Sequence, residues 1–350
     1  MRTGAALLLL IYAVTATAQA HAALDAALAA YPQIHARETE KLKNGDPTAK
    51  FVLARGMNGL GNRNYGLVAS FALALYQKAA LYVHWLEQGC DGFADAEGVA
   101  CAAATLESLF ANPGIAWTAV RPFGNHGGRN GGSTRVHYVD ETSPSGNSRS
   151  GSGLGASAEI LIDSRSAADE LTLHTANLST WRGTIVHSDH FLLPLILCNP
   201  GVSSAGLFPA DHIEAQATLE RWLLKPSKPI RTAVAQALKR AGGCAVGLHL
   251  RGKRHKAAEA GHFHWRVDDV WPRLREEVKR RKGGLFVTAD GHLALLRNGL
   301  ESRAWEEGIT VVKTDNLGRG QAGGAMTALA ENHILSKCSL IVPSDPSSFL

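Results

Sequence analysis

An arginine at the end of an apolar run is the first side chain in this sequence that is suited to bind an anion. The run covers residues 245–250 (Ala-Val-Gly-Leu-His-Leu), and Arg251 follows it, with further basic residues up to position 256. An apolar run between glycines predicts a buried strand of a parallel sheet, and ligands bind outside the carboxyl ends of such strands. Because the guanidinium fork matches phosphate oxygens, we expect a phosphorylated ligand at Arg251. The alternative is a solvated basic turn.

Two further polar loops follow strands of the same predicted sheet. Asp290 comes directly after an apolar strand at 285–289, and Ser347 and Ser348 follow a strand at 340–342. A carboxylate accepts hydrogen bonds from a ribose or a base edge, and hydroxyl groups and cations bind phosphates. Together with Arg251, these loops predict a nucleoside diphosphate site. The alternatives are a helix N-cap at Asp290 and a polar turn at the two serines.

A glycine-rich loop occupies residues 55–64 in the amino-terminal half, between a strand at 51–54 and a buried helix at 65–77. With a further strand at 81–83, this order indicates a parallel sheet. The helix start behind the glycines is suited to an anion, and Asn62 and Arg63 lie there, either to reach a ligand or to cap the helix. Gly59-x-Gly61 lacks the third glycine of a dinucleotide fingerprint, which argues against a nicotinamide cofactor.

The elements that must position these residues form two domains, as 350 residues suggest. We expect an α/β domain over 45–225 and a second over 230–350, with Pro226 and Pro229 marking the linker. Residues 123–157 are low in complexity and predict a surface loop. The first domain should also hold a strand at 159–162 and a helix at 207–224. The second should hold helices at 230–241, 269–282 and 325–336 and strands at 244–250, 285–289, 309–312 and 340–342, with Pro272 in the first turn of its helix.

Composition and charge limit the classes of partner. The chain is 45% hydrophobic and 19% charged, which is typical of a globular protein. A net charge of +5 and a pI near 9.0 fit an anionic ligand or acidic glycans. Because no basic stripe interleaved with aromatic residues and no helix-turn-helix pattern occurs, nucleic acid is not an expected partner.

The amino terminus predicts a secretory signal peptide over residues 1–20. Arg2 precedes an apolar run at 5–14, and small residues then lead to a cleavage site after Ala20 or Ala22. The alternative is an uncleaved signal anchor, and no other stretch is apolar enough to span a bilayer. The protein is therefore expected in the secretory pathway.

The chain has five cysteines, and a secreted protein passes through oxidising compartments in which cysteines form disulfides. Cys90 and Cys101 flank a short segment and are the first expectation for a disulfide, whereas Cys244 and Cys338 stand before core strands and are expected as buried thiols. No Cys-x-x-Cys occurs, and His262-x-His264 has no carboxylate at metal-site spacing, so we expect no bound metal.

Four segments of the chain resemble motifs of the GDP-fucose-dependent fucosyltransferase superfamily, which includes α1,6-, α1,2- and protein O-fucosyltransferases. The matching residues are Gly59-Leu60-Gly61-Asn62-Arg63, His249-x-Arg251, Val287-Thr288-Ala289-Asp290, and Glu331-x-His333-x-Leu335-Ser336 followed by Ser347-Ser348-Phe349. The ordered blocks cover about residues 51–85 and 245–350.

The resemblance implies a GT-B architecture, in which two Rossmann-like domains face each other across a cleft. It implies inverting, metal-independent transfer of fucose from GDP-fucose to a glycan or glycoprotein. Arg251 would then stabilise the departing GDP. Glu259 would act as the general base on the acceptor hydroxyl, with an exposed loop carboxylate as the alternative. His249 would orient the site, and Asn62 and Arg63 would reach the donor from the facing domain.

The sequence also departs from the family pattern. Lys253 and Arg254 stand where many relatives have an acidic residue, and relatives continue with a helix after the last motif, which implies a truncated second domain. The resemblance implies a Golgi lumenal protein, with secretion as the alternative. Two other functions remain open: a non-catalytic secreted relative that binds glycans, and a GT-B transferase that uses another nucleotide sugar.

Overall fold

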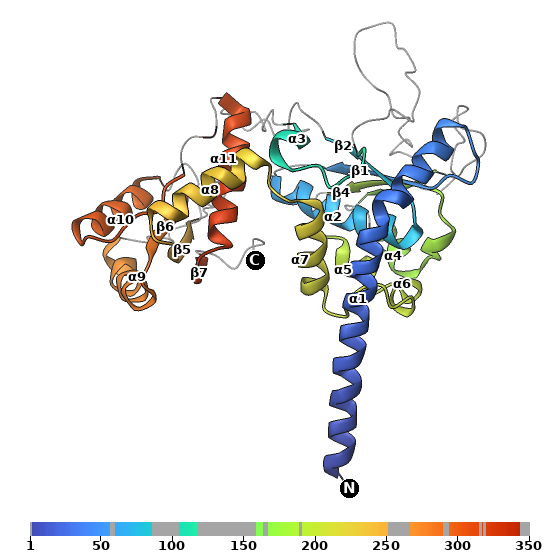
Figure 1. The fold of residues 1–350 in the computed structure, drawn as a ribbon, viewed down its shortest axis with the longest axis horizontal. Helices are drawn as coiled ribbons and strands as arrows, with labels where there is room; N and C mark the ends of the chain where they lie inside the picture. Colours follow the sequence, from blue (N-terminus) through green and yellow to red (C-terminus); the bar gives the residue numbers. More distant parts are fainter. Residues whose placement is uncertain are drawn as a thin grey trace, which may run out of the picture. The chain divides into compact units, whose positions relative to one another are not determined.

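The computed structural model describes residues 2–56, 60–85, 105–117, 159–163, 167–188, 191–250, 267–289, 294–314, 317 and 320–343. The chain divides into two compact units (Figure 1). The first unit comprises Met1–Cys101 and Asn112–Lys225, and the second comprises Ala102–Ala111 and Pro226–Leu350. The low-complexity segment at 123–157 and the expected Cys90–Cys101 bridge lie outside the described residues.

The described elements follow one another as helices and parallel strands. In the first unit they are α1 (Arg2–Lys43), β1 (Phe51–Gly56), α2 (Leu60–Gln77), β2 (Ala80–His84), β3 (Glu159–Asp163), α4 (Ala167–Thr175), η1 (Leu178–Thr180), β4 (Gly183–Ser188), α5 (Leu193–Leu197), α6 (Pro200–Ser204) and α7 (His212–Leu223). In the second unit they are α3 (Leu106–Leu109), α8 (Lys228–Arg240), β5 (Cys244–Leu250), α9 (Val267–Arg281), β6 (Gly284–Ala289), α10 (Ala294–Glu306), α11 (Gly320–Leu335) and β7 (Leu340–Pro343).

The first unit is built on a parallel sheet in the order β2-β1-β4-β3. Helix α2 packs on β1 and is buried without interruption from Gly66 to Leu75. Phe71 of α2 stacks on Trp222 of α7 with 4.9 Å between ring centroids, and Tyr31 of α1 meets both rings edge-on. Aromatic pairs of this geometry stabilise a core beyond the area they bury, so this cluster joins α1, α2 and α7.

Helix α1 is tied to the start of β2 by polar side chains. The Tyr31 hydroxyl donates to the Ala79 carbonyl at 3.0 Å, and the Leu81 N–H donates to Nδ1 of His35 at 3.2 Å. The predicted cleavage sites after Ala20 and Ala22 lie within α1. No helix in the described part of the chain is long and apolar enough to cross a membrane.

The second unit is built on a parallel sheet in the order β6-β5-β7. Helices α9 and α10 pack against each other and cover one face, while α8 and α11 pack together on the other (Figure 1). Alternate side chains of β5, at positions 246, 248 and 250, join the core under α9 and α10. The positions between them face α11, because a Cβ on Gly247 would lie 2.8 Å from Cδ2 of Leu335. Helices cover both faces of this parallel sheet, which confirms the predicted α/β class.

Several local expectations differ from the structure. Residues 309–312 form no full strand, and only one bridge pairs Val311 with Leu285, because the Ile309 N–H is used to close α10 on the Ala304 carbonyl. Pro272 stands in the second turn of its helix, since α9 begins at Val267. The helix expected from 207 begins at His212, where the Asp211 side chain accepts from the Ile213 N–H.

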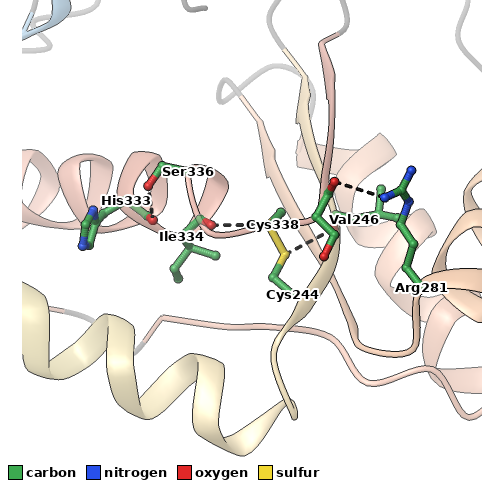
Figure 2. The surroundings of a disulfide bond; sticks show 8 residues. Cys244, Val246, Arg281, His333, Ile334, Ser336 and Cys338 are labelled. Carbon is green, nitrogen blue, oxygen red and sulfur yellow. Dashed lines mark hydrogen bonds between the residues drawn. A yellow bond between two sulfur atoms is a disulfide. The ribbon is translucent and has the colours of Figure 1, made fainter. Parts of the chain in front are cut away.

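The expectation that Cys244 and Cys338 are buried thiols is wrong, because the two form a disulfide (Figure 2). Cys244 is the first residue of β5, and Cys338 lies in the turn between α11 and β7. The backbone aligns the pair, since the Ser339 N–H donates to the Cys244 carbonyl at 3.0 Å. The bond therefore joins the beginnings of two neighbouring strands. Cys198 is an exposed free cysteine.

Removing this disulfide should weaken the second unit. The bond closes a loop of 94 residues, and in the chain-entropy model a loop of this size contributes about 4 to 5 kcal/mol by restricting the unfolded chain. We expect the double variant C244A/C338A to lose several kcal/mol of unfolding free energy in urea titrations. The matched control C198A should leave it unchanged. An equal midpoint for the double variant and the control would contradict a stabilising role.

Acid should destabilise the first unit through His35. Its side chain is 2% exposed, and burial lowers its pKa from about 6.5 to about 4. Because the unfolded state binds the proton first, the stabilisation is complete above pH 6.5 and is lost as the pH falls toward 4. At about 1.4 kcal/mol per pH unit, the loss reaches about 3 kcal/mol.

The variant H35N should flatten this pH dependence, because an amide oxygen can still accept from the Leu81 N–H but does not titrate in this range. The exposed His174 supplies the control H174N. Urea unfolding between pH 4 and 7.5 measures the effect, and an unchanged slope in H35N would show that other groups cause the acid lability.

Candidate active site

The three strands of the second sheet end side by side. His249, next to last in β5, pairs in register with Thr288 of β6 and with Pro343 of β7. Parallel strands that pair in register end at the same edge of the sheet. In open α/β sheets, ligands bind just beyond the carboxyl ends of the strands. The predicted residues Arg251, Asp290, Ser347 and Ser348 come after these strand ends in the chain, but they and Glu259 lie outside the described residues.

A hydrogen bond joins two of the sequence motifs at this edge. The hydroxyl of Thr288 donates to Oε2 of Glu331 on α11 at 2.7 Å, and Thr288 is only 6% exposed. Thr288 therefore points toward α11, and so does His249, which stands at the same level on the α11 face of β5. A hydrogen bond to a carboxylate is stronger than one between neutral groups. The bond fixes the end of β6, one residue before Ala289, against α11.

Glu331 and Thr288 had no predicted role beyond membership in the motifs. Their pairing spans 43 residues of chain, so no local pattern shows it. The signal that could have indicated a partner was the residue type of Glu331. A carboxylate on a helix that packs against a sheet needs a hydrogen-bond donor from that sheet.

Another motif residue, His333, lies two positions further along α11. Burial, together with the positive charges of Lys337 and Arg231, lowers its pKa below the usual histidine value. The neutral form of the imidazole is therefore favoured at neutral pH.

In the first unit, the structure places Arg63 and Asn62 in the first turn of α2, which begins five residues earlier than the sequence suggested. Arg63 is 5% exposed, and its guanidinium carbon lies 5.3 Å from the ring centroid of Trp85, just after β2. Asn62 is exposed. The cation–π contact holds the guanidinium of Arg63 against the indole of Trp85. These residues mark the carboxyl edge of the first sheet.

Metal ligands are not gathered in the described part of the chain, where no group of three His, Cys, Asp or Glu side chains could hold an ion. His262 and His264 lie outside the described residues.

Comparison with known proteins gives a fold and no sequence relative. No protein-family profile and no curated protein matches the sequence. The structure of a FUT1 variant from Arabidopsis thaliana in complex with GDP matches with a TM-score of 0.57 and 18% identity, over 93% of this chain and 75% of that one. This protein has the fold of the GT-B fucosyltransferases.

Two further structures match less closely. Fucosyltransferase NodZ from Bradyrhizobium has a TM-score of 0.46 and 13% identity, over 86% of this chain and 90% of that one. POFUT1 in complex with GDP-fucose has a TM-score of 0.43 and 12% identity, over 87% of this chain and 93% of that one.

The Thr288–Glu331 bond can be tested by removing the donor. In T288V the half-buried carboxylate loses its partner while the side-chain shape is kept, and the loss of one hydrogen bond costs about 1 kcal/mol. Urea unfolding should show this loss. The control S336A removes an exposed hydroxyl of the turn after α11, which bonds only the His333 carbonyl, and should change the free energy by less than about 0.5 kcal/mol. Equal effects of the two variants would contradict a special role for Thr288.

Proposed function

We propose that this protein transfers fucose from GDP-fucose to a hydroxyl group of a glycan or glycoprotein, with inversion at the sugar carbon. The observation that carries the proposal is the common edge at which β5, β6 and β7 end in register. The motif residues follow this edge in the chain, and the fold is shared with FUT1, whose structure is a complex with GDP. The four sequence motifs support the choice of GDP-fucose as the donor.

In this mechanism Arg251 binds the diphosphate. As the bond between fucose C1 and the phosphate oxygen breaks, negative charge grows on GDP, and a fixed guanidinium favours that state over the bound donor. The hydroxyl groups of Ser347 and Ser348 add hydrogen bonds to the phosphates. Asp290 accepts hydrogen bonds from the ribose or the guanine. No metal ion is needed, because the arginine supplies the positive charge.

The acceptor hydroxyl attacks C1 from the opposite side, and Glu259 takes its proton. One C–O bond forms as the other breaks, so the products are the fucoside, GDP and one proton held by the carboxylate. His249 orients the arginine loop from within β5. Asn62 and Arg63 would contact the donor from the first unit.

The Cys244–Cys338 disulfide supports a site of action in the secretory pathway, and we propose the Golgi lumen. Disulfides persist in oxidising compartments and are rare in the cytosol. This agrees with the predicted signal peptide over residues 1–20, and a glycoprotein acceptor would be met in the same compartment.

Binding of GDP gives the first test. At a GDP concentration of a hundred times its Kd, a site that exists only in the folded protein raises the unfolding free energy by about 2.7 kcal/mol. We expect this shift in thermal unfolding of the full chain, and we expect R251A to abolish it. The control R280A removes an exposed arginine of α9 that pairs with Glu277 and should keep the full shift.

The absence of any shift with millimolar GDP would overturn the proposal. A shift with UDP or ADP instead of GDP would indicate another nucleotide-sugar donor. Turnover is tested separately, by measuring GDP released from GDP-fucose with a panel of glycoprotein acceptors. The variant E259Q should bind GDP normally and release it far more slowly, whereas a wild-type protein that binds GDP and never turns over would be a non-catalytic relative.

A further inference from the structure

An open hollow lies in the second unit between helix α10 and the segment that follows it. Its volume is about 760 Å³, within the range of about 300–1,000 Å³ that is common for ligand sites. One wall is a single face of α10, because its members are three or four residues apart. The wall residues are Asn298, Glu301, Ser302 and Trp305, and the other side includes Thr310 and Lys313.

Trp305 is the unusual member of this wall. Its side chain is 82% exposed, whereas Trp117, Trp181 and Trp271 are 1%, 8% and 6% exposed. An indole exposed to water does not gain the stabilisation that burial of its large apolar surface would give. Its flat face is suited to the C–H face of a sugar ring, which is apolar and of similar size.

The polar groups around the indole suit a neutral, hydroxyl-rich ligand. Lys313 is paired within the hollow, because its Nζ lies 2.9 Å from Oε2 of Glu301. The other carboxylate oxygen of Glu301 lies 3.9 Å from Nε of Arg297, which does not line the hollow. The Asn298 amide and the Ser302 hydroxyl, one turn apart on α10, offer donors and acceptors. An acidic ligand would have to compete with Glu301 for Lys313, so the site favours a neutral sugar over a phosphate or a carboxylate.

A peptide strand fits this place less well. The segment beside the hollow makes a single bridge to β6, and its Thr310 carbonyl and Val312 N–H are both occupied by Leu285. The Lys313 carbonyl accepts from Nη2 of Arg240 at 3.3 Å. An added strand would have only the short stretch at 309–313 to pair with, whereas a glycan needs only the side chains.

The hollow is remote from the nucleotide edge of the sheet. The bridge at Val311 joins Leu285, the second residue of β6, while the nucleotide edge lies beyond Ala289. At about 3.3 Å per residue, these two levels of β6 are about 13 Å apart. A ligand in the hollow would therefore leave the strand ends open.

We propose that this hollow is a second carbohydrate-binding site, which holds a neutral oligosaccharide against Trp305. The glycan stacks on the indole and hydrogen-bonds to Asn298 and Ser302, and the Glu301–Lys313 pair forms the rim. If the proposed transfer holds, the site would also keep a glycosylated acceptor near the protein and raise its effective concentration. Binding itself does not depend on the transfer.

The test uses the full chain and three neutral probes, chitotetraose, mannotetraose and maltotetraose, at up to 10 mM in calorimetry and tryptophan fluorescence. We expect at least one probe to bind and to change the fluorescence. W305A should weaken that binding about tenfold or more, which corresponds to about 1.4 kcal/mol, and W305F should recover part of it. The variants N298A and S302A should weaken it by smaller factors.

The matched control is L295A, which removes an exposed side chain of the same helix (85% exposed) that does not line the hollow. It should bind the sugar as the wild type does, and so should R251A. Failure of all three probes, binding kept by W305A, or binding lost in R251A would each overturn the proposal. Salt-sensitive binding of an acidic heparin oligosaccharide in place of the neutral probes would also overturn it. The GDP measurement is separate, so failure of either site is distinguishable from failure of the other.

Discussion

The parallel pairing of β5 with a strand on each side is the constraint on which the second unit depends. β5 is the middle strand, and its backbone hydrogen bonds set the level of β6 and of β7 at once. A shift of one residue would turn the core side chains of β5 from the α9 and α10 face to the α11 face. Gly247 would then be replaced by a larger residue beneath Leu335, where even a Cβ does not fit. Packing on both faces therefore selects one register, and this register places Thr288 within reach of Glu331.

The sequence predicts best where local composition and tertiary packing agree. The strand at 244–250 has the observed bounds because a buried central strand must be apolar along its whole length. Prediction was poorer at edges and ends. Residues 309–312 are as apolar as a strand, but one of their backbone groups serves the end of α10. The first turn of α2 contains glycine and asparagine, which locally favour a loop, yet the helix begins at Leu60, and Arg63 in that turn is buried.

Contacts between distant segments could not be predicted from the chain alone. The thiols of Cys244 and Cys338 meet because α11 returns the chain to the beginning of β5, and this requires the fold to be known. The Thr288–Glu331 bond and the contact of Arg63 with Trp85 depend in the same way on elements brought together by the two sheets. The predicted site could be assigned by motif, because motif residues follow strand ends, but the side chains that support those ends are found only from the structure.

The disulfide has a consequence for damaged copies of the protein. The ring that it closes contains α9, β6, α10 and α11, as well as the stretch of chain at 251–266. A protease that cuts once anywhere inside this ring produces two fragments that remain one covalent molecule. Both sides of the cut stay attached to the start of β5, so the fragments can reassemble without a search through solution. In an extracellular or lumenal setting, a nicked molecule would therefore run as the intact chain on a gel until it is reduced.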